Sequence, residues 1–342
     1  MSSGQLHPEL EAFFSVASRE LEDTLRAIIS VDDSPIPNLD DALEYALGLD
    51  SDSTGQGKRL RPLLCLLVAE QLGGHRTHAM PFAAAIELMH NFCLVHDDIE
   101  DGDEYRRGRP AVWVRYGLAH AINIGDYLFT KIFAALLSGT DRLSEQKLIR
   151  FFALMTATLD HTHRGQALDI NARTKRISID DYLKIVKEKT GYYLAAPLIA
   201  GALSADAPQE IEESLSRYGL FIGPMFQIRD DLIDLTHGKG RNEIGSDIRE
   251  GKRSFMVAYA CEHASSSALE QLFEILDKPR EKTTPEDVSR AIGIFERCGA
   301  LREAERICEQ LKAQALAALD PIPHKLKSSL AAVTEYLAGR TK

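Results

Sequence analysis

Hydrophobic positions along the chain recur at intervals of three and four residues, and Ala, Leu, Glu and Arg fill most of that pattern. This spacing places the apolar side chains on one face of an α-helix. Runs that alternate β-branched and polar residues, as strands do, are scarce. The pattern therefore predicts an all-α protein of ten or more helices.

Glycines and prolines indicate where these helices begin and end. Pro62 suits the first turn of a helix that ends at Gly73-Gly74, and Pro81 is expected to begin the next one. The segment 32–57 is rich in Asp, Ser, Pro and Gly and predicts a loop. We expect one helical domain over residues 1–342, because no segment resembles an interdomain linker. Further turns are predicted at Gly102, Gly108–Pro110, Asp206–Pro208, Gly238–Gly240, Pro279, Pro285 and Pro321–Pro323.

The composition is that of a globular protein, since 44% of the 342 residues are hydrophobic and 27% are charged. This excludes disordered, collagen-like and small disulfide-rich proteins. The 51 acidic residues outnumber the 40 basic ones, which gives a net charge of −11. Without a basic block, we expect no binding to nucleic acid or to an anionic membrane surface.

The cellular location is also suggested by the sequence. Five cysteines occur without a CxxC pair, so we expect reduced thiols. The longest apolar run, 62–69, is shorter than the ~20 residues of a membrane span, and residues 1–11 do not resemble a secretory signal. We therefore expect a cytoplasmic protein without stable membrane insertion.

The motif DDxxD occurs twice, at 97–101 and 230–234, each time after apolar helical sequence. The first and last aspartates of each motif share one helix face, because residues four apart lie about 40° apart around the axis. A single copy is most often a solvated face. Two copies favour facing helices that hold a diphosphate through several Mg²⁺ ions, since clustered carboxylates need a cation and Mg²⁺ prefers oxygen ligands and phosphates.

Basic residues near the first motif supply positive charge for a diphosphate. Lys58 and Arg61 precede a predicted helix start, where backbone N–H groups favour an anion. Arg106 and Arg107 follow the motif, and arginine forks suit phosphate oxygens. His90 stands seven residues before the motif, on the same helix face. Each residue also has a structural explanation: a solvated turn, charge balance or a hydrogen-bonded core histidine.

Two lysines later in the chain supply further positive charge. Lys189 enters an apolar helix, where a snorkelling lysine is the alternative explanation. Lys252 lies in a predicted turn, where it could simply be exposed. Together with the first group, these lysines provide the cations that a metal-bridged diphosphate site needs.

These segments resemble the trans-isoprenyl diphosphate synthase (polyprenyl synthetase) family. The resemblance implies an α-helical bundle around a central cavity, a homodimer, and a transferase of isoprenoid biosynthesis that condenses isopentenyl diphosphate with dimethylallyl, geranyl or farnesyl diphosphate. The matching segments are GKRLRP at 57–62, ELMHNFCLVHDDIED at 87–101, RRGRP at 106–110, GQALDI at 165–170, EKTG at 188–191, FQIRDDLID at 226–234 and GSDIREGK at 245–252.

The resemblance also implies a role for each motif residue. Mg²⁺, three ions with substrate bound, would be held by Asp97, Asp98, Asp101, Asp230 and Asp234, with Asp231 close by. The allylic diphosphate would be held by Arg106, Lys189 and Lys252, with Thr190 and Gln227 beside it. Isopentenyl diphosphate would be held by Lys58, Arg61, His90 and Arg107.

The chemistry implied is ionisation followed by carbon–carbon bond formation. Mg²⁺ and the cationic side chains would stabilise the leaving diphosphate. Thr190, Gln227 and backbone carbonyls would stabilise the allylic carbocation, which the isopentenyl double bond then attacks. The released diphosphate would accept the proton, so no side-chain base is required.

Product length is expected to depend on Phe92 and the smaller Cys93, just before the first motif. In the family, one aromatic residue here without an insertion in the motif resembles geranylgeranyl diphosphate synthases. A second aromatic would suggest farnesyl diphosphate, and small residues would suggest longer products. On an ideal helix Phe92 points about 140° away from Asp97, so Met89 or Leu88 could share the role, or Phe92 could be ordinary core.

Two departures leave alternatives open. Where the family has GKxxGxD, this chain has RNEIGSD at 241–247, so Asn242 replaces the usual lysine and Lys239 or Arg241 would substitute for it. Asn242, Ser246 and Glu250 also have the spacing of a terpene cyclase metal triad. The two aspartate motifs and GKRLRP argue against a cyclase, and intact aspartate motifs argue against a non-catalytic subunit.

Overall fold

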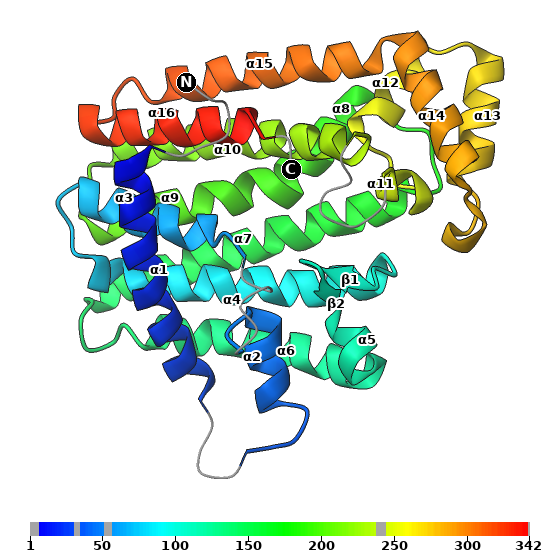
Figure 1. Ribbon diagram of the computed structural model, residues 1–342. Helices are drawn as coiled ribbons and strands as arrows, with labels where there is room; N and C mark the ends of the chain where they lie inside the picture. The colour runs from blue at the N-terminus through cyan, green and yellow to red at the C-terminus, as the bar shows by residue number, and fades with distance from the viewer. Residues whose placement is uncertain (1–6, 31–34, 51–56, 237–243, 341–342) are drawn as a thin grey trace. The chain divides into compact units, whose positions relative to one another are not determined.

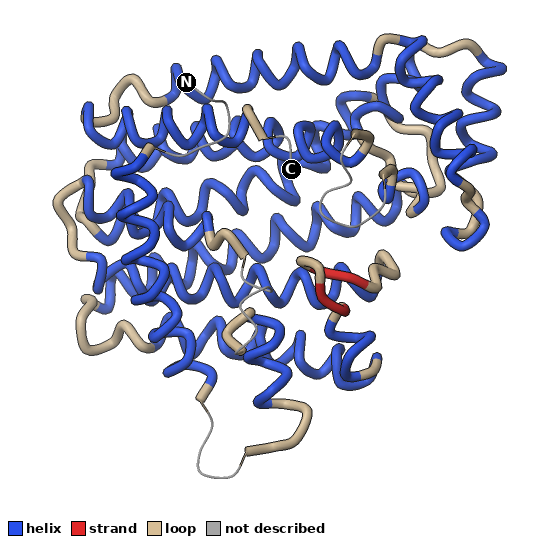
Figure 2. Tube along the Cα trace, viewed as in Figure 1, coloured by secondary structure: helices blue, strands red, loops and turns tan. Residues whose placement is uncertain are grey.

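The computed structural model describes residues 7–30, 35–50, 57–236 and 244–340. Within those ranges the elements are helices joined by loops, apart from one two-stranded hairpin, as the tube in Figure 2 shows, so the prediction of an all-α protein is confirmed. The helices are α1 (Pro8–Ile29), α2 (Asp40–Leu47), α3 (Leu60–Gln71), α4 (Arg76–Glu100), α5 (Val112–Tyr116), α6 (Leu118–Leu137), α7 (Glu145–Ala172), α8 (Ile179–Val186), α9 (Tyr192–Ser204), α10 (Gln209–Asp234), α11 (Ser246–Arg249), α12 (Phe255–His263), α13 (Ser266–Leu276), α14 (Pro285–Cys298), α15 (Ala300–Ala318) and α16 (His324–Ala338).

The chain divides into two compact units. The N-terminal unit contains residues 7–156 and 197–212, and the C-terminal unit contains residues 157–196 and 213–340. Along the chain, α7, α9 and α10 each begin in one unit and end in the other. The single domain expected over residues 1–342 stays a prediction.

The N-terminal unit is built around α4. This helix packs most extensively against α6 and α3 (Figure 1). Its apolar residues cover the whole circumference, and the run from Phe82 to Ile86 has no exposed surface. A helix that is hydrophobic on all sides is stable only when other helices surround it. The C-terminal end of α4 carries the first aspartate motif, so this motif is attached to the rigid centre of the unit.

The C-terminal unit places α10, α15 and α16 side by side (Figure 1). Tyr218 of α10 is fully buried, and its hydroxyl donates to the Leu330 carbonyl of α16 at 3.1 Å. The start of α8 is capped by Ser178, whose hydroxyl accepts from the Asp181 N–H at 3.0 Å while the Asp181 carboxylate accepts from the Ser178 N–H. A π-helical turn, Lys187–Gly191, follows α8 directly.

One local expectation needs correction, and the structure adds detail to two others. The helix expected to begin at Pro81 begins at Arg76, and the buried proline lies inside α4, next to Gly139. The loop expected over 32–57 contains α2, whose apolar face is covered by the rest of the unit. The interruption at 108–110 is a hairpin of β1 (Tyr105–Arg106) and β2 (Arg109–Pro110). Each difference depends on tertiary contacts that local spacing does not report.

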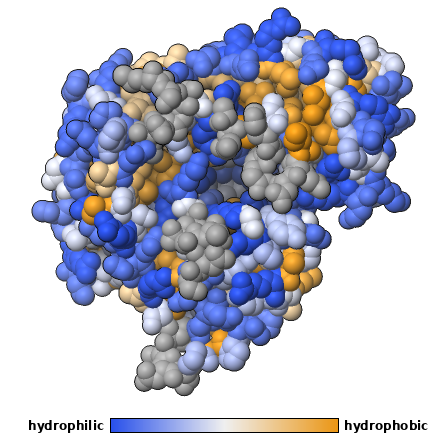
Figure 3. Space-filling view, in the orientation of Figure 1, coloured by the Kyte–Doolittle hydropathy of each residue, from blue (hydrophilic) through white to orange (hydrophobic). Residues whose placement is uncertain are grey.

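The face of the molecule drawn in Figure 3 is largely hydrophilic, with hydrophobic residues in separate patches. Among the residues that the structure describes, no helix combines the length and the apolar character that crossing a membrane requires.

Candidate active site

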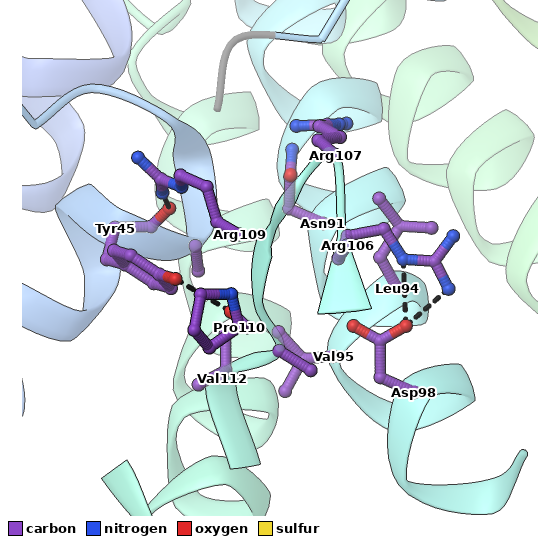
Figure 4. A pocket seen from close by; sticks show the side chains of 12 residues that line it. Tyr45, Asn91, Leu94, Val95, Asp98, Arg106, Arg107, Arg109, Pro110 and Val112 are labelled. Carbon is purple, nitrogen blue, oxygen red and sulfur yellow. Dashed lines mark hydrogen bonds and ion pairs between the residues drawn. The ribbon is translucent and has the colours of Figure 1, made fainter. Parts of the chain in front are cut away.

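The first aspartate motif occupies the last turn of α4. Asp97 and Asp101 are half-buried, whereas Asp98 is buried with 2% of its surface exposed. The Arg106 Nε donates to Asp98 Oδ1 at 2.8 Å (Figure 4). The Nη2 of Arg106 also pairs with Asp103 at 3.3 Å. Burial raises the pKa of Asp98 to about 6, although the guanidinium of Arg106 opposes the increase. Asp97 and Asp101 are therefore the motif's more accessible carboxylates.

A tight hairpin positions the arginines that follow. Arg107 and Gly108 have φ angles of 53° and 74°, as a two-residue hairpin turn with left-handed central residues requires. Figure 4 shows Arg106 extending towards Asp98 and Arg109 towards Tyr45. Arg109 is tied to the protein, because its guanidinium donates to the Tyr45 carbonyl at 2.8 Å and to the Asp50 carboxylate. The predicted phosphate ligands Arg106 and Arg107 thus stand on a rigid support.

A cationic cluster forms around His90 in the same unit. Burial, followed by the guanidinium groups of Arg61, Arg107 and Arg106, holds the pKa of His90 well below its usual value. A Cβ on Gly57 would lie 2.6 Å from an Arg107 guanidinium nitrogen, so this glycine lets the segment before α3 approach the hairpin. Arg61, His90 and Arg107, which are predicted to hold isopentenyl diphosphate, therefore lie close to Arg106, which is predicted to hold the allylic diphosphate. Lys58 is exposed and follows Gly57 in the segment before α3.

Arg59 belongs to this segment, and the sequence provided no signal for its role. It has a φ of 45°, which is unusual for a residue other than glycine, and its side chain is buried. The guanidinium pairs with Glu22 of α1 and Glu87 of α4, each at 3.2 Å, and donates to the Leu47 carbonyl at 3.1 Å. Arg59 thereby anchors the chain between Lys58 and Arg61 to three helices.

A pocket in the C-terminal unit brings together the residues predicted to hold the allylic diphosphate. It is lined by Lys189, Thr190, Gln227 and Lys252, among others. Partial burial opposes the charge of Lys252, but nearby carboxylates, Asp247 first, outweigh it and raise its pKa well above the usual value. Lys252 is therefore cationic at neutral pH, and Lys189 lies beside it in the same pocket.

The second aspartate motif ends α10, and its three aspartates differ in environment. Asp230 is half-buried, and Arg340 approaches it at 3.4 Å. Asp231 is buried and accepts hydrogen bonds from the Tyr182 hydroxyl at 2.8 Å, Gln227 Nε2 at 3.0 Å and a backbone N–H. Asp234 has no exposed surface and accepts from the Ser246 hydroxyl and the Asp247 N–H at the start of α11.

The two motifs contain both half-buried and buried carboxylates. Asp98 and Asp234, both predicted as metal ligands, are engaged by Arg106 and by the start of α11, respectively. Within the described ranges, no group of three or more His, Cys, Asp or Glu side chains is arranged to hold a metal ion. Mg²⁺ usually keeps several waters and binds one or two carboxylates plus substrate phosphates. The half-buried Asp97, Asp101 and Asp230 fit that mode of binding. The positions proposed for the missing lysine contact, Lys239, Arg241 and Asn242, lie outside the described residues.

The residues expected to set product length lie two turns before the end of α4. Phe92 is 9% exposed, and its ring packs against His96 at 5.1 Å and Phe129 of α6 at 5.4 Å, between centroids. Cys93 is half-buried, and the alternatives Met89 and Leu88 have no exposed surface. Phe92 is thus part of an aromatic contact between α4 and α6 that the sequence did not indicate.

Comparisons with known proteins identify the family of the chain. The polyprenyl synthetase family model matches residues 41–295. The short chain isoprenyl diphosphate synthase of Methanothermobacter thermautotrophicus is 40% identical over 258 residues, which cover 74% of this chain and 77% of that protein. The geranylfarnesyl diphosphate synthase of Aeropyrum pernix is 35% identical over 298 residues, covering 84% and 91%.

A solved structure extends the similarity to the fold. The geranylgeranyl pyrophosphate synthase from Corynebacterium glutamicum, crystallised with isoprenyl diphosphate and magnesium, has a TM-score of 0.86 and 27% identity, covering 97% of this chain and 99% of that one. The family model spans most of the chain, including both aspartate motifs and the cationic residues around them. The chain therefore belongs to the polyprenyl synthetase family of trans-isoprenyl diphosphate synthases.

Proposed function

We propose that this enzyme condenses isopentenyl diphosphate with allylic diphosphates in the cytoplasm and that its main product is geranylgeranyl diphosphate. The observation that carries the proposal is the pocket in which Lys189, Thr190, Gln227 and Lys252 converge. Two cations and two neutral hydrogen-bonding groups suit a substrate with an anionic head and a reactive allylic carbon. The product assignment rests on the single aromatic residue Phe92 before the first motif.

Different residues act on the diphosphate and on the allylic carbon of the substrate. Lys189 and Lys252 hold the allylic diphosphate and stabilise the charge that develops as its carbon–oxygen bond breaks. The hydroxyl of Thr190 and the amide of Gln227 face the allylic carbocation; Gln227 is oriented by its hydrogen bond to Asp231. The isopentenyl double bond then forms the new carbon–carbon bond, and the released diphosphate takes the proton.

Binding of isopentenyl diphosphate is assigned to the cluster of Arg61, His90 and Arg107, with Lys58 at its edge. The depressed pKa of His90 keeps its imidazole neutral, so it acts as a hydrogen-bonding group among arginines. Asp97, Asp101 and Asp230 are proposed as Mg²⁺ ligands, and bound Mg²⁺ supplies Lewis-acid stabilisation of the diphosphate leaving group. A homodimer belongs to the same proposal, and light scattering of the purified protein tests it.

The experiment incubates labelled isopentenyl diphosphate with dimethylallyl, geranyl or farnesyl diphosphate and Mg²⁺, and reads product length by chromatography. We expect geranylgeranyl diphosphate from all three starters. Asp97→Ala and Asp230→Ala should each abolish turnover while circular dichroism stays that of the wild type. A product that ends at farnesyl diphosphate, or continues beyond geranylgeranyl diphosphate, would refute the length assignment alone.

A terpene cyclase is tested in the same experiment by supplying geranylgeranyl diphosphate without isopentenyl diphosphate. We expect the substrate to be recovered unchanged. A hydrocarbon product would favour the cyclase and contradict the proposed condensation.

A further inference from the structure

Asp169, in the GQALDI segment of α7, has no role in the reaction proposed for this enzyme, yet it contacts that reaction's pocket. Its carboxylate oxygen Oδ2 accepts a hydrogen bond from Lys189 Nζ at 3.0 Å. Only 6% of the residue is exposed, and it lines the same pocket as Lys189 and Lys252. A buried carboxylate is stable only with a cationic or hydrogen-bonding partner, and here the partner is a residue assigned to the substrate.

The backbone of Lys189 is held by the same helix. Gly165 lies four residues before Asp169, so both occupy one face of α7. A Cβ on Gly165 would lie 2.6 Å from the Lys189 Cα, which is closer than real Cβ contacts allow. The helix therefore approaches the main chain of Lys189 at Gly165 and holds its ammonium group at Asp169, one turn further on.

The charge of Asp169 is directed at both lysines of the pocket. Burial favours its neutral form, but Lys189 and then Lys252 outweigh burial and lower the pKa of Asp169 below its usual value. The carboxylate is therefore ionised at neutral pH. A lysine side chain has four rotatable bonds, and ordering it when substrate binds costs conformational entropy unless the protein has already ordered it.

We propose that Asp169 is a positioning residue for the allylic diphosphate site, which holds the Lys189 ammonium in the orientation that the diphosphate meets. The inference rests on the proposed function, because it takes Lys189 as a ligand of the allylic substrate. Asp169 acts through the lysine rather than on the reacting atoms. The GQALDI segment, recognised in the sequence only as a likeness to the family, thereby acquires a physical role.

The test compares Asp169→Asn and Asp169→Ala with wild type in steady-state kinetics. Asparagine keeps the volume and one acceptor but removes the charge, whereas alanine removes the contact. We expect kcat/KM for the allylic diphosphate to fall roughly 10- to 100-fold in Asp169→Ala and less in Asp169→Asn. KM for isopentenyl diphosphate should stay within about twofold of wild type, since that contact is not assigned to Lys189.

Asp160→Ala is the matched control. Asp160 lies on the same helix and also pairs with a cation, Arg164, at 3.0 Å, but both side chains are more than half exposed. We expect its kinetics to equal those of wild type, because exposed pairs contribute little.

A double-mutant cycle separates positioning from general structure. If Asp169 acts through Lys189, Asp169→Ala should change kcat/KM by less than about twofold in the Lys189→Ala background. The inference would be overturned if Asp169→Ala lowered kcat/KM in the Lys189→Ala background as much as it does in the wild type. It would also be overturned if Asp169→Ala alone had the kcat/KM of the wild type. Circular dichroism and thermal melting show whether each variant is folded. If Asp169→Ala does not fold, Asp169→Asn replaces it in the double-mutant cycle. A wild type that forms no prenyl product would refute the proposed function instead.

Discussion

Some side chains in this enzyme have structural roles that their residue type does not indicate. Arg59 lies in a cationic segment that binds an anion in the proposed function, yet its own guanidinium is buried between Glu22 and Glu87. Asn91 donates a further hydrogen bond to Glu87 at 3.1 Å. The charge of Arg59 therefore stabilises the segment, whereas its neighbours Lys58 and Arg61 are the residues proposed to bind the substrate.

Replacing Arg59 by alanine should lower the free energy of unfolding by about 3–5 kcal/mol, because it leaves Glu87 buried without its cation. Urea denaturation followed by circular dichroism measures the change. Arg306→Ala is the control, since Arg306 is exposed and its pair with the half-buried Glu303 should contribute less than about 1 kcal/mol. Equal losses in the two variants would contradict the structural role of Arg59.

Phe92 offers a second test at the scale of one side chain. Phe92→Ala removes the ring that packs against Phe129, so an apolar chain growing along α4 should extend further and the product should lengthen. Chromatography of the products measures the distribution. Phe82→Leu, at a fully buried position of the same helix, is the control and should leave the distribution unchanged. If Phe92→Ala yields the wild-type product, Phe92 does not set the length.

At the scale of the elements, the π-turn Lys187–Gly191 depends on the neighbouring helices for its position. A π-turn is rare and occurs mainly at functional sites, because its geometry must be imposed by surrounding structure. Here glycines of two helices permit the close packing: Gly165 of α7 approaches Lys189, and Gly223 of α10 approaches Gly191 and the Thr190 carbonyl. Two of the proposed substrate ligands are thus placed by contacts between backbones.

Gly223→Ala should disrupt this packing. The new Cβ would lie 2.6 Å from the Gly191 Cα, and a backbone atom cannot move aside as a flexible side chain can. We expect a loss of about 1–3 kcal/mol in unfolding free energy and a lower kcat/KM for the allylic diphosphate.

Gly293→Ala on α14 is the matched control, because its new methyl group would meet only the flexible end of Arg297 at 3.2 Å. Alanine in a helix is favoured over glycine by up to about 1 kcal/mol, so this variant should be unchanged or stabilised. Thermal melting and kinetics of both variants provide the comparison. A fully active and stable Gly223→Ala would show that the close approach is not required.

At the scale of the whole molecule, a chain with a net charge of −11 must bind anionic substrates. Local clusters make this possible, because charges within a few ångströms act more strongly than distant, screened ones. Arginines surround His90 in one unit, and two lysines line the pocket of the other. Mg²⁺ usually binds one or two carboxylates together with substrate phosphates, so metal and diphosphate should bind cooperatively.

Mg²⁺ and inorganic pyrophosphate together should therefore raise Tm more than the sum of their separate effects, by roughly 2–4 °C or more at saturating ligand. Differential scanning fluorimetry with each ligand, with both, and with EDTA measures this coupling. Asp97→Asn should weaken the joint effect. An equal shift by pyrophosphate in EDTA would refute metal-assisted binding.

Much of this molecule could be read from its sequence. The helical periodicity predicted the all-α fold, and the two DDxxD motifs with their cationic segments predicted the family, because helix formation and motif spacing are local properties of the chain. Local spacing also placed the helix breaks within a few residues. It misplaced the start of α4 at Pro81 and missed β1 and β2, where burial and a left-handed turn outweigh local preference.

Only the folded structure distinguished residues of the same type from one another. Asp98, Asp231 and Asp234 are buried and accept hydrogen bonds from the protein, whereas Asp97, Asp101 and Asp230 are only half-buried, although all six belong to DDxxD motifs. Arg59 and Asp169 likewise have partners 20 or more residues away in the chain. Burial and pairing depend on which distant segments come together, and therefore tertiary packing decides which charged groups are buried and which remain accessible.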